Sequence, residues 1–140
     1  MTSFAVLMIC VFGQVALTLW AIISMGMARI KELKKREIPL SEIALATDAY
    51  PEHIKKLQNN ATNQFETPML FFAAAGFAVA LDMVGVGIAL GAVLFFASRL
   101  VHRSIHIRSN RLQSRFKAFV VGLLGLVVMW LSLAYGLLSG

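Results

Sequence analysis

Four long apolar stretches dominate this sequence and limit what it can fold into. They cover about residues 4–28, 57–81, 83–101 and 118–138. Each is close to, or longer than, the roughly 20 residues that a helix needs to cross the hydrocarbon core of a bilayer. Of the 140 residues, 59% are hydrophobic, which is more apolar surface than a soluble domain of this size can bury. The sequence therefore predicts an all-α membrane protein that forms one domain over residues 1–140, with four transmembrane helices.

The first apolar stretch differs from a cleaved signal peptide. It is longer than the apolar core of such a peptide, and no basic residue precedes it. Arg29 and Lys31 follow it in the manner of a stop-transfer signal. We therefore expect the first stretch to remain part of the protein as its first transmembrane helix.

The basic residues indicate the orientation of the chain in the membrane. All 13 lysines and arginines fall in or beside two loops, 29–56 and 102–117, and none lies near Asp82 in the loop between them. Because loops rich in Lys and Arg stay in the cytoplasm, both basic loops are predicted to be cytoplasmic and both termini to lie on the other side. Topology thus explains the positive charge, and no nucleic-acid partner is expected.

A polar cluster interrupts the start of the second apolar stretch, with the sequence NNATNQFETP over residues 59–68. We expect one continuous helix over residues 51–81, beginning with Pro51 in its first turn or with Asp48 as its N-cap. Steps of three and four residues then place Asn59, Asn63 and Glu66 on one face of that helix. Pro68 lacks an N–H group, so it frees the carbonyl of Gln64 and is expected to bend the helix.

Basic side chains are predicted to meet this cluster from two other helices. Arg99, His102 or Arg103, His106 and Asn110 recur at helical spacing, and Arg115 begins the fourth helix. Glu66, Arg99 and Arg115 should then lie at similar depths on three helices, where a carboxylate and a guanidinium pair favourably. The cluster is either a binding site or a set of groups that satisfy one another and fix the helices.

The remaining basic residues of this region have a simpler interpretation. Arg103, Arg108, Arg111 and Lys117 are interpreted as residues that set topology or contact lipid headgroups. His102 and His106 are four residues apart, as two metal ligands on one face would be, but a third ligand would have to be Glu66 from another helix. We therefore predict no metal site.

Small residues in the third and fourth stretches point to close helix contacts. Gly87 and Gly91 form a GxxxG motif, and Gly122 and Gly125 lie in the fourth stretch. Such glycines let helix backbones approach each other, either between subunits or within one chain. Cys10 is the only cysteine, so it forms no disulfide within the chain, and we expect it to pack as a small buried residue.

Two motifs carry a resemblance to a known family. The sequences NQFETPMLF and RLVHRSIH, set in four predicted spans with a long first loop, resemble the MAPEG family of membrane-associated proteins in eicosanoid and glutathione metabolism. The pattern looks like a bacterial member, which would place the chain in an inner membrane. The resemblance implies a left-handed four-helix bundle, assembly as a homotrimer, and a glutathione site between subunits on the cytoplasmic side.

The resemblance also implies roles for particular residues. Asn63 and Glu66 would bind polar groups of glutathione, with Asn59 and His102 in the same site. Arg99 would face a glutathione carboxylate or pair with Glu66.

Arg115 would be the catalytic residue, because a nearby guanidinium lowers the pKa of a thiol and stabilises the thiolate. The implied activity is that of a glutathione-dependent transferase or peroxidase, similar to the microsomal glutathione transferases. Its substrates would be lipophilic electrophiles that enter from the membrane lipid.

Two alternatives remain beside this activity. Thr62, Phe116 and Phe119 stand where many family members carry functional polar side chains, which favours a non-catalytic membrane protein that binds a lipid or a partner protein. A small transporter is the weaker alternative, because the halves of the helices away from the cytoplasm are apolar except for Gln14.

Overall fold

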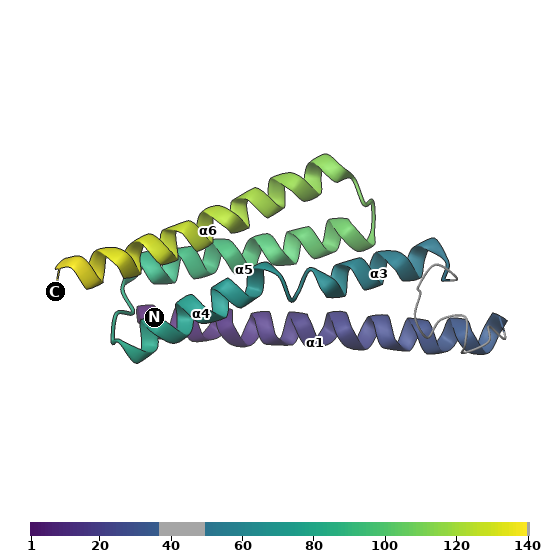
Figure 1. Ribbon diagram of the computed structural model, residues 1–140, viewed down its shortest axis with the longest axis horizontal. Helices are drawn as coiled ribbons and strands as arrows, with labels where there is room; N and C mark the ends of the chain where they lie inside the picture. The colour runs from purple at the N-terminus through teal and green to yellow at the C-terminus, as the bar shows by residue number, and fades with distance from the viewer. Residues whose placement is uncertain (37–49, 140) are drawn as a thin grey trace.

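The computed structural model describes residues 1–36 and 50–139, and these form helices joined by short turns, with no strand in the described segments. The helices run roughly side by side along the long axis of the molecule (Figure 1). They are α1 (Ser3–Arg36), α3 (Glu52–Thr62), α4 (Thr67–Ala80), α5 (Val86–Ile107) and α6 (Leu112–Ser139). Within the described segments, α1, α5 and α6 are each long and apolar enough to cross a membrane.

Helix α1 buries one narrow face and exposes the rest. Its buried residues recur every three or four positions, which is the spacing of a single helical stripe. In the apolar part of the helix they are Leu7, Cys10, Gln14, Leu17 and Ala21, and Glu32 is also buried nearer its C-terminal end. Cys10 packs in the hydrophobic core, as predicted. The helix has 34 residues and continues past the first apolar stretch to Arg36, so its basic last turns extend beyond the part that lipid would cover.

The expectation of one continuous helix over residues 51–81 is wrong, because the chain breaks between Thr62 and Thr67. Pro68 lies in the first turn of α4, where the missing N–H group leaves no helical carbonyl unpaired. Within a continuous helix the same proline would clash with the turn before it and would leave the Gln64 carbonyl without a donor. The proline therefore starts a second helix, and α3 and α4 follow each other end to end (Figure 1).

The start of α3 also differs from one of the two expectations. Pro51 is the N-cap of this helix rather than a residue of its first turn, with extended backbone angles. The alternative cap, Asp48, lies outside the described residues.

The hydrophobic core lies between α1, α4, α5 and α6. Phe71 of α4 stacks on Phe95 of α5, with ring centroids 4.8 Å apart and an angle of 11° between the planes. Both rings are almost completely buried, and Ile88, Met129 and Leu133 join them in the core. Burial of these large side chains fixes how the helices rest on each other.

Two of the predicted contact glycines bring α5 and α6 into direct backbone contact. A Cβ atom on Gly91 would lie 2.6 Å from the Gly125 carbonyl oxygen, and one on Gly125 would lie 2.7 Å from the Gly91 carbonyl oxygen. Real Cβ atoms do not approach other atoms this closely, so glycine is required at both positions. Of the two interpretations of these glycines, close packing within one chain is therefore confirmed for Gly91 and Gly125.

Candidate functional site

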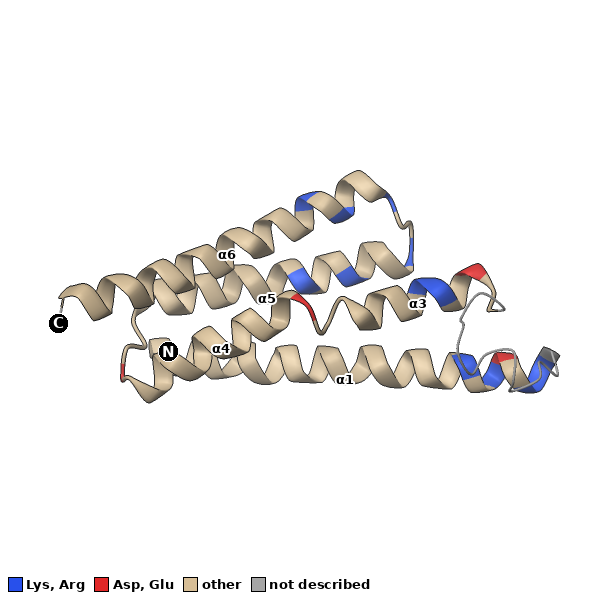
Figure 2. Cartoon of the chain, viewed as in Figure 1, with Lys and Arg blue, Asp and Glu red and all other residues tan. Residues whose placement is uncertain are grey.

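The charged residues of the described segments concentrate toward one end of the molecule. Lysines and arginines lie toward the end away from both termini (Figure 2), and Glu66 lies in the segment between α3 and α4. The α4–α5 turn, near the termini, carries Asp82 and no basic residue. The described basic residues and the Asp82 turn, which lie apart in the sequence, therefore also lie toward opposite ends of the folded molecule.

A pocket of about 190 Å³ lies at this basic end, between the α3–α4 junction, α5 and the start of α6. Three of its lining residues belong to the predicted site, and the other three are apolar. The lining residues are Asn63, His102, Leu112, Arg115, Phe116 and Phe119. The lining can thus contact both a polar or charged group and a hydrocarbon or aromatic group.

Arg99 stabilises the helix break beside this pocket. Its side chain is buried, and its Nη2 donates a hydrogen bond to the backbone carbonyl oxygen of Asn63 at 2.7 Å. A cation at this point also interacts favourably with the negative end of the α3 dipole. Glu66 is exposed but lies within electrostatic range of Arg99. The structure thus brings Arg99, Glu66 and Asn63 to the same junction.

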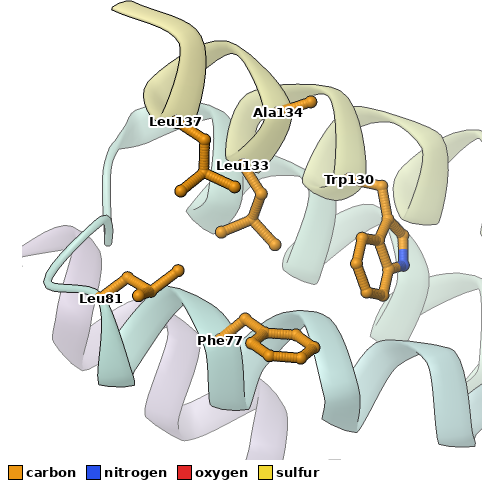
Figure 3. A pocket seen from close by; sticks show the side chains of 6 residues that line it. All are labelled: Phe77, Leu81, Trp130, Leu133, Ala134 and Leu137. Carbon is orange, nitrogen blue, oxygen red and sulfur yellow. The ribbon is translucent and has the colours of Figure 1, made fainter. Parts of the chain in front are cut away.

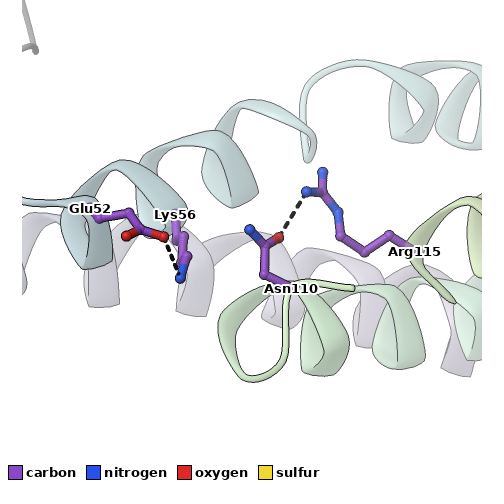
Figure 4. A network of polar contacts seen from close by, with 4 residues as sticks. All are labelled: Glu52, Lys56, Asn110 and Arg115. Carbon is purple, nitrogen blue, oxygen red and sulfur yellow. Dashed lines mark hydrogen bonds and ion pairs between the residues drawn. The ribbon is translucent and has the colours of Figure 1, made fainter. Parts of the chain in front are cut away.

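Arg115 is held in place by a residue of the turn that follows α5. Its Nη1 donates to Oδ1 of Asn110 at 2.9 Å (Figure 4). Asn110 was expected on the helical row of Arg99 and His106, but α5 ends at Ile107. Asn110 instead has a φ of 49°, a left-handed conformation that asparagine tolerates, and its N–H caps the helix by donating to Ile105.

The predicted site residue Asn59 lies apart from the pocket. It is exposed on α3 and does not line the pocket, whereas its neighbour Asn60 is completely buried. Near the start of the same helix, Lys56 bonds to Glu52 with a 2.8 Å separation (Figure 4). This hydrogen bond and the positive charge lower the pKa of the exposed Glu52 carboxyl.

The interpretation of Arg103 as a residue that contacts lipid headgroups is wrong. Its side chain is buried, and Nη1 donates to Oδ1 of Asn60 while Nη2 donates to Oγ of Ser24 at 3.1 Å. Its guanidinium also lies 4.4 Å from the ring centroid of Trp20, a cation–π distance. Arg103 therefore joins α1, α3 and α5. By contrast, Arg108, Arg111 and Lys117 are exposed, as that interpretation expects.

The spacing of Arg103 from Arg99 in the sequence could have predicted that Arg103 is buried. Arg103 lies four residues after Arg99, so the two side chains share one face of α5. A helix face that buries one guanidinium favours burial of the next one on the same face. The partner Asn60 was harder to find, because Asn59 occupies the adjacent position and only the rotational setting of α3 decides which of the two faces inward.

A hydrogen bond between two glutamines joins α1 to the segment between α3 and α4. Gln14 is completely buried, and its Nε2 donates to Oε1 of Gln64 at 3.0 Å. Gln64 in turn donates to the backbone carbonyl of Asn60 at 3.4 Å. The one strongly polar residue of the first apolar stretch therefore satisfies a polar residue of the broken segment, which lowers the cost of burying both.

Two buried histidines follow Arg99 on α5. The ring centroids of His102 and His106 lie 5.9 Å apart, with the rings at 61° to each other. Among the residues the structure describes, no three His, Cys, Asp or Glu side chains gather in a group suited to holding a metal ion.

A second pocket, of about 290 Å³, lies between α4 and α6 near the opposite end of the molecule (Figure 3). Its lining is apolar and consists of Phe77, Leu81, Trp130, Leu133, Ala134 and Leu137. The Phe77 and Trp130 rings meet edge to face, with centroids 6.1 Å apart. This pocket suits a hydrocarbon chain or ring.

Long apolar helices with a polar pocket at one end define the class of the protein as an integral membrane protein. A comparison with family models identifies it further. The model of the MAPEG family matches residues 7–135, so the chain belongs to that family, as its motifs indicated. Comparison with curated proteins found no match, and comparison with solved structures found none either.

Proposed function

We propose that this protein is a glutathione-dependent transferase or peroxidase that acts on lipophilic electrophiles at the membrane surface. The observation that carries this proposal is the composition of the pocket at the basic end. Its lining combines the polar side chains of Asn63, His102 and Arg115 with the apolar side chains of Leu112, Phe116 and Phe119. A tripeptide thiol needs the polar side chains, and an apolar electrophile needs the apolar ones.

Arg115 is the proposed catalytic residue. A glutathione thiol is largely protonated at neutral pH, and the thiolate is the reactive form. The guanidinium of Arg115 is positioned at the pocket by Asn110, where its charge would stabilise the thiolate and lower the pKa of the bound thiol. The thiolate would then attack the electrophilic atom of a substrate lying against Phe116 and Phe119.

The other residues of the predicted site fit a ligand held between neighbouring chains. Glu66 and Asn59 are exposed in the single chain, and Asn63 is half-buried at the pocket. We propose that the chain assembles as a homotrimer and that a neighbouring subunit closes the site over these groups. Arg99, with its Nε buried and without a hydrogen-bond partner in the described segments, would support a glutathione carboxylate or Glu66.

We further propose that α3 and α4 together make one crossing of the membrane, giving a left-handed bundle of four crossings. The site then faces the cytoplasm of a bacterial cell, and both termini lie across the inner membrane. Supporting this, the basic residues of the described segments lie toward the end that carries the pocket (Figure 2). Native mass spectrometry of the detergent-solubilised protein tests the trimer, and a mass of one or two chains contradicts it.

Conjugation of chlorodinitrobenzene to glutathione by the purified protein tests the activity. Arg115→Ala is expected to lower kcat by about 100-fold or more, because it removes the charge that stabilises the thiolate. Glu66→Gln is expected to weaken glutathione binding. The matched control is Arg108→Ala, which removes an exposed arginine beyond the end of α5. Normal turnover in both site variants would overturn the residue assignment.

The alternative is a non-catalytic membrane protein that binds a lipid. The apolar pocket between α4 and α6 favours it, because that pocket offers no polar side chain to a reacting group (Figure 3). Calorimetric titration with glutathione separates the two functions. Saturable binding supports the enzyme, whereas no binding together with a co-purifying lipid supports the alternative.

A further inference from the structure

The proposed chemistry needs an acceptor for the proton that the thiol loses. Arg115 stabilises a thiolate but cannot take this proton, because a guanidinium is already protonated. Asn63 has an amide without a basic nitrogen. Of the three polar side chains that line the pocket, His102 alone offers a nitrogen lone pair that can accept a proton.

We propose that His102 accepts the thiol proton and passes it to His106, which carries it toward the end of α5. This inference rests on the proposed glutathione chemistry. His102 lines the pocket, and its Nδ1 is buried without a hydrogen-bond partner among the described residues. Most buried polar atoms in proteins have such a partner, so an unpaired ring nitrogen beside a pocket is available to a proton.

His106 is placed to receive the proton from His102. It lies one helical turn further along α5, and the two ring centroids are 5.9 Å apart. Its side chain is almost completely buried, and neither ring nitrogen has a hydrogen-bond partner in the described part of the chain. A rotation of the rings or one bridging water spans this separation.

The charges around the two imidazoles make proton uptake depend on the ligand. Arg99 of α5 and Arg115 of α6 place positive charge near His102. The same two arginines and Lys56 of α3 place positive charge near His106. A bound thiolate supplies the opposite charge, so the imidazolium forms as the partner of the thiolate.

The proposed step balances without any further reagent. The S–H bond breaks, the proton moves to a ring nitrogen of His102, and the electron pair stays on sulfur. The sulfur pair forms the bond to the electrophilic carbon, and the leaving group departs as an anion with the pair of its own broken bond. The proton then moves through His106 to solvent, which returns His102 to its neutral form for the next turnover.

Proton counting on the full-length protein in detergent tests this proposal. Glutathione is mixed with the protein in weak buffer, thiolate is followed by its ultraviolet absorbance, and released protons by a pH indicator. His102→Gln is expected to raise the apparent pKa of the bound thiol by about one unit and to slow conjugation about 100-fold. Glutathione affinity by calorimetry should change much less. His106→Gln is expected to form thiolate normally but to release the proton late.

His53→Gln is the matched control, because its side chain on α3 is 64% exposed and does not line the pocket. A second variant, His102→Ala, should regain activity when free imidazole is added. If both His102 variants match His53→Gln while the wild type forms thiolate, the role of His102 is overturned and the glutathione chemistry stands. If His106→Gln releases its proton as the control does, the relay is overturned. If the wild type forms no thiolate, the proposed function and this inference both fall.

Discussion

A buried guanidinium needs partners for its donors, and Arg103 finds them on two other helices. Oδ1 of Asn60 and Oγ of Ser24 accept its hydrogen bonds, and the face of Trp20 receives its charge. In an apolar surrounding these contacts contribute more to stability than they would at a solvent-exposed surface, because losing them leaves a buried polar group without a hydrogen-bond partner. Arg103 therefore holds α1, α3 and α5 together, and it does so without any ligand.

Arg103→Ala is expected to lower the free energy of unfolding by about 2–4 kcal/mol, since it leaves the Asn60 amide buried without its partner. Unfolding of the detergent-solubilised protein by a denaturing detergent measures this loss. A double-mutant cycle with Asn60→Ala should give a coupling energy of about 1 kcal/mol or more.

Arg108→Ala is the comparison for this prediction, because Arg108 is exposed just beyond α5 and its loss should change stability by less than about 0.5 kcal/mol. Equal effects of the two arginine substitutions would show that Arg103 is not held by these partners.

Asn110 combines two roles that substitutions can separate. Its backbone, with a positive φ, caps the last turn of α5 by donating to Ile105, and its side chain holds Arg115. Asn110→Gly keeps the left-handed backbone and removes only the amide, so stability should stay nearly unchanged while kcat falls about threefold to tenfold. Asn110→Ala should lose the same activity and also about 1 kcal/mol of stability, because alanine is strained in this conformation. Unchanged turnover in Asn110→Gly would show that Arg115 needs no such support.

At the scale of the helices, apolar length predicted most of the secondary structure, and local geometry decided the rest. The long apolar stretches became α1, α4, α5 and α6, because lipid selects helices that satisfy their own backbone. The break between Thr62 and Thr67 was missed, since the sequence around Pro68 fits a bent helix as well as a broken one. What decides between them is the donor that Arg99 supplies to the freed backbone, and that donor comes from another helix.

In the candidate site, too, the sequence predicted some features, and contacts between helices decided the others. Asn63 and Arg115 were predicted and line one pocket, because spacing along each helix places residues on faces. The Arg103–Asn60 contact could not be predicted, because hydropathy does not give the rotation of one helix against another. The positive charge of Arg103 also hid its buried role. A lysine or arginine near a membrane surface is readily explained by the orientation of the chain, so no other role was expected for it.

The contact between α5 and α6 yields a prediction for the helices as elements. Gly91→Ala should destabilise the protein by about 1–3 kcal/mol, because the new Cβ would meet the Gly125 carbonyl and the Met129 side chain. Gly76→Ala is the matched control, since a Cβ there meets nothing within 4 Å and alanine favours the helix. Thermal unfolding in detergent compares the two. A Gly91→Ala protein as stable as the control would show that α5 and α6 do not touch at this point.

At the scale of the whole molecule, the two ends of the protein differ in charge and in which turns and termini they carry. Both termini and the α4–α5 turn lie at one end, and the α5–α6 turn lies at the other (Figure 1). The basic residues lie toward the second end, together with the polar pocket (Figure 2). A membrane that retains positive charge on its cytoplasmic side would therefore also place the pocket there, within reach of a soluble thiol.

Cysteine labelling tests this orientation on the whole protein. In a Cys10→Ala background, single cysteines replace Ser109 in the α5–α6 turn, Gly85 in the α4–α5 turn and Ser139 near the C-terminus. All three positions are exposed, and a Cβ on Gly85 meets nothing within 4 Å, so the substitutions should be tolerated. A membrane-impermeant maleimide added to spheroplasts should label Gly85→Cys and Ser139→Cys. It should label Ser109→Cys only after the membrane is opened, because the proposed orientation places that turn in the cytoplasm. Labelling of Ser109→Cys in closed spheroplasts, with protection of the other two, would reverse the orientation and place the pocket on the side away from cytoplasmic glutathione.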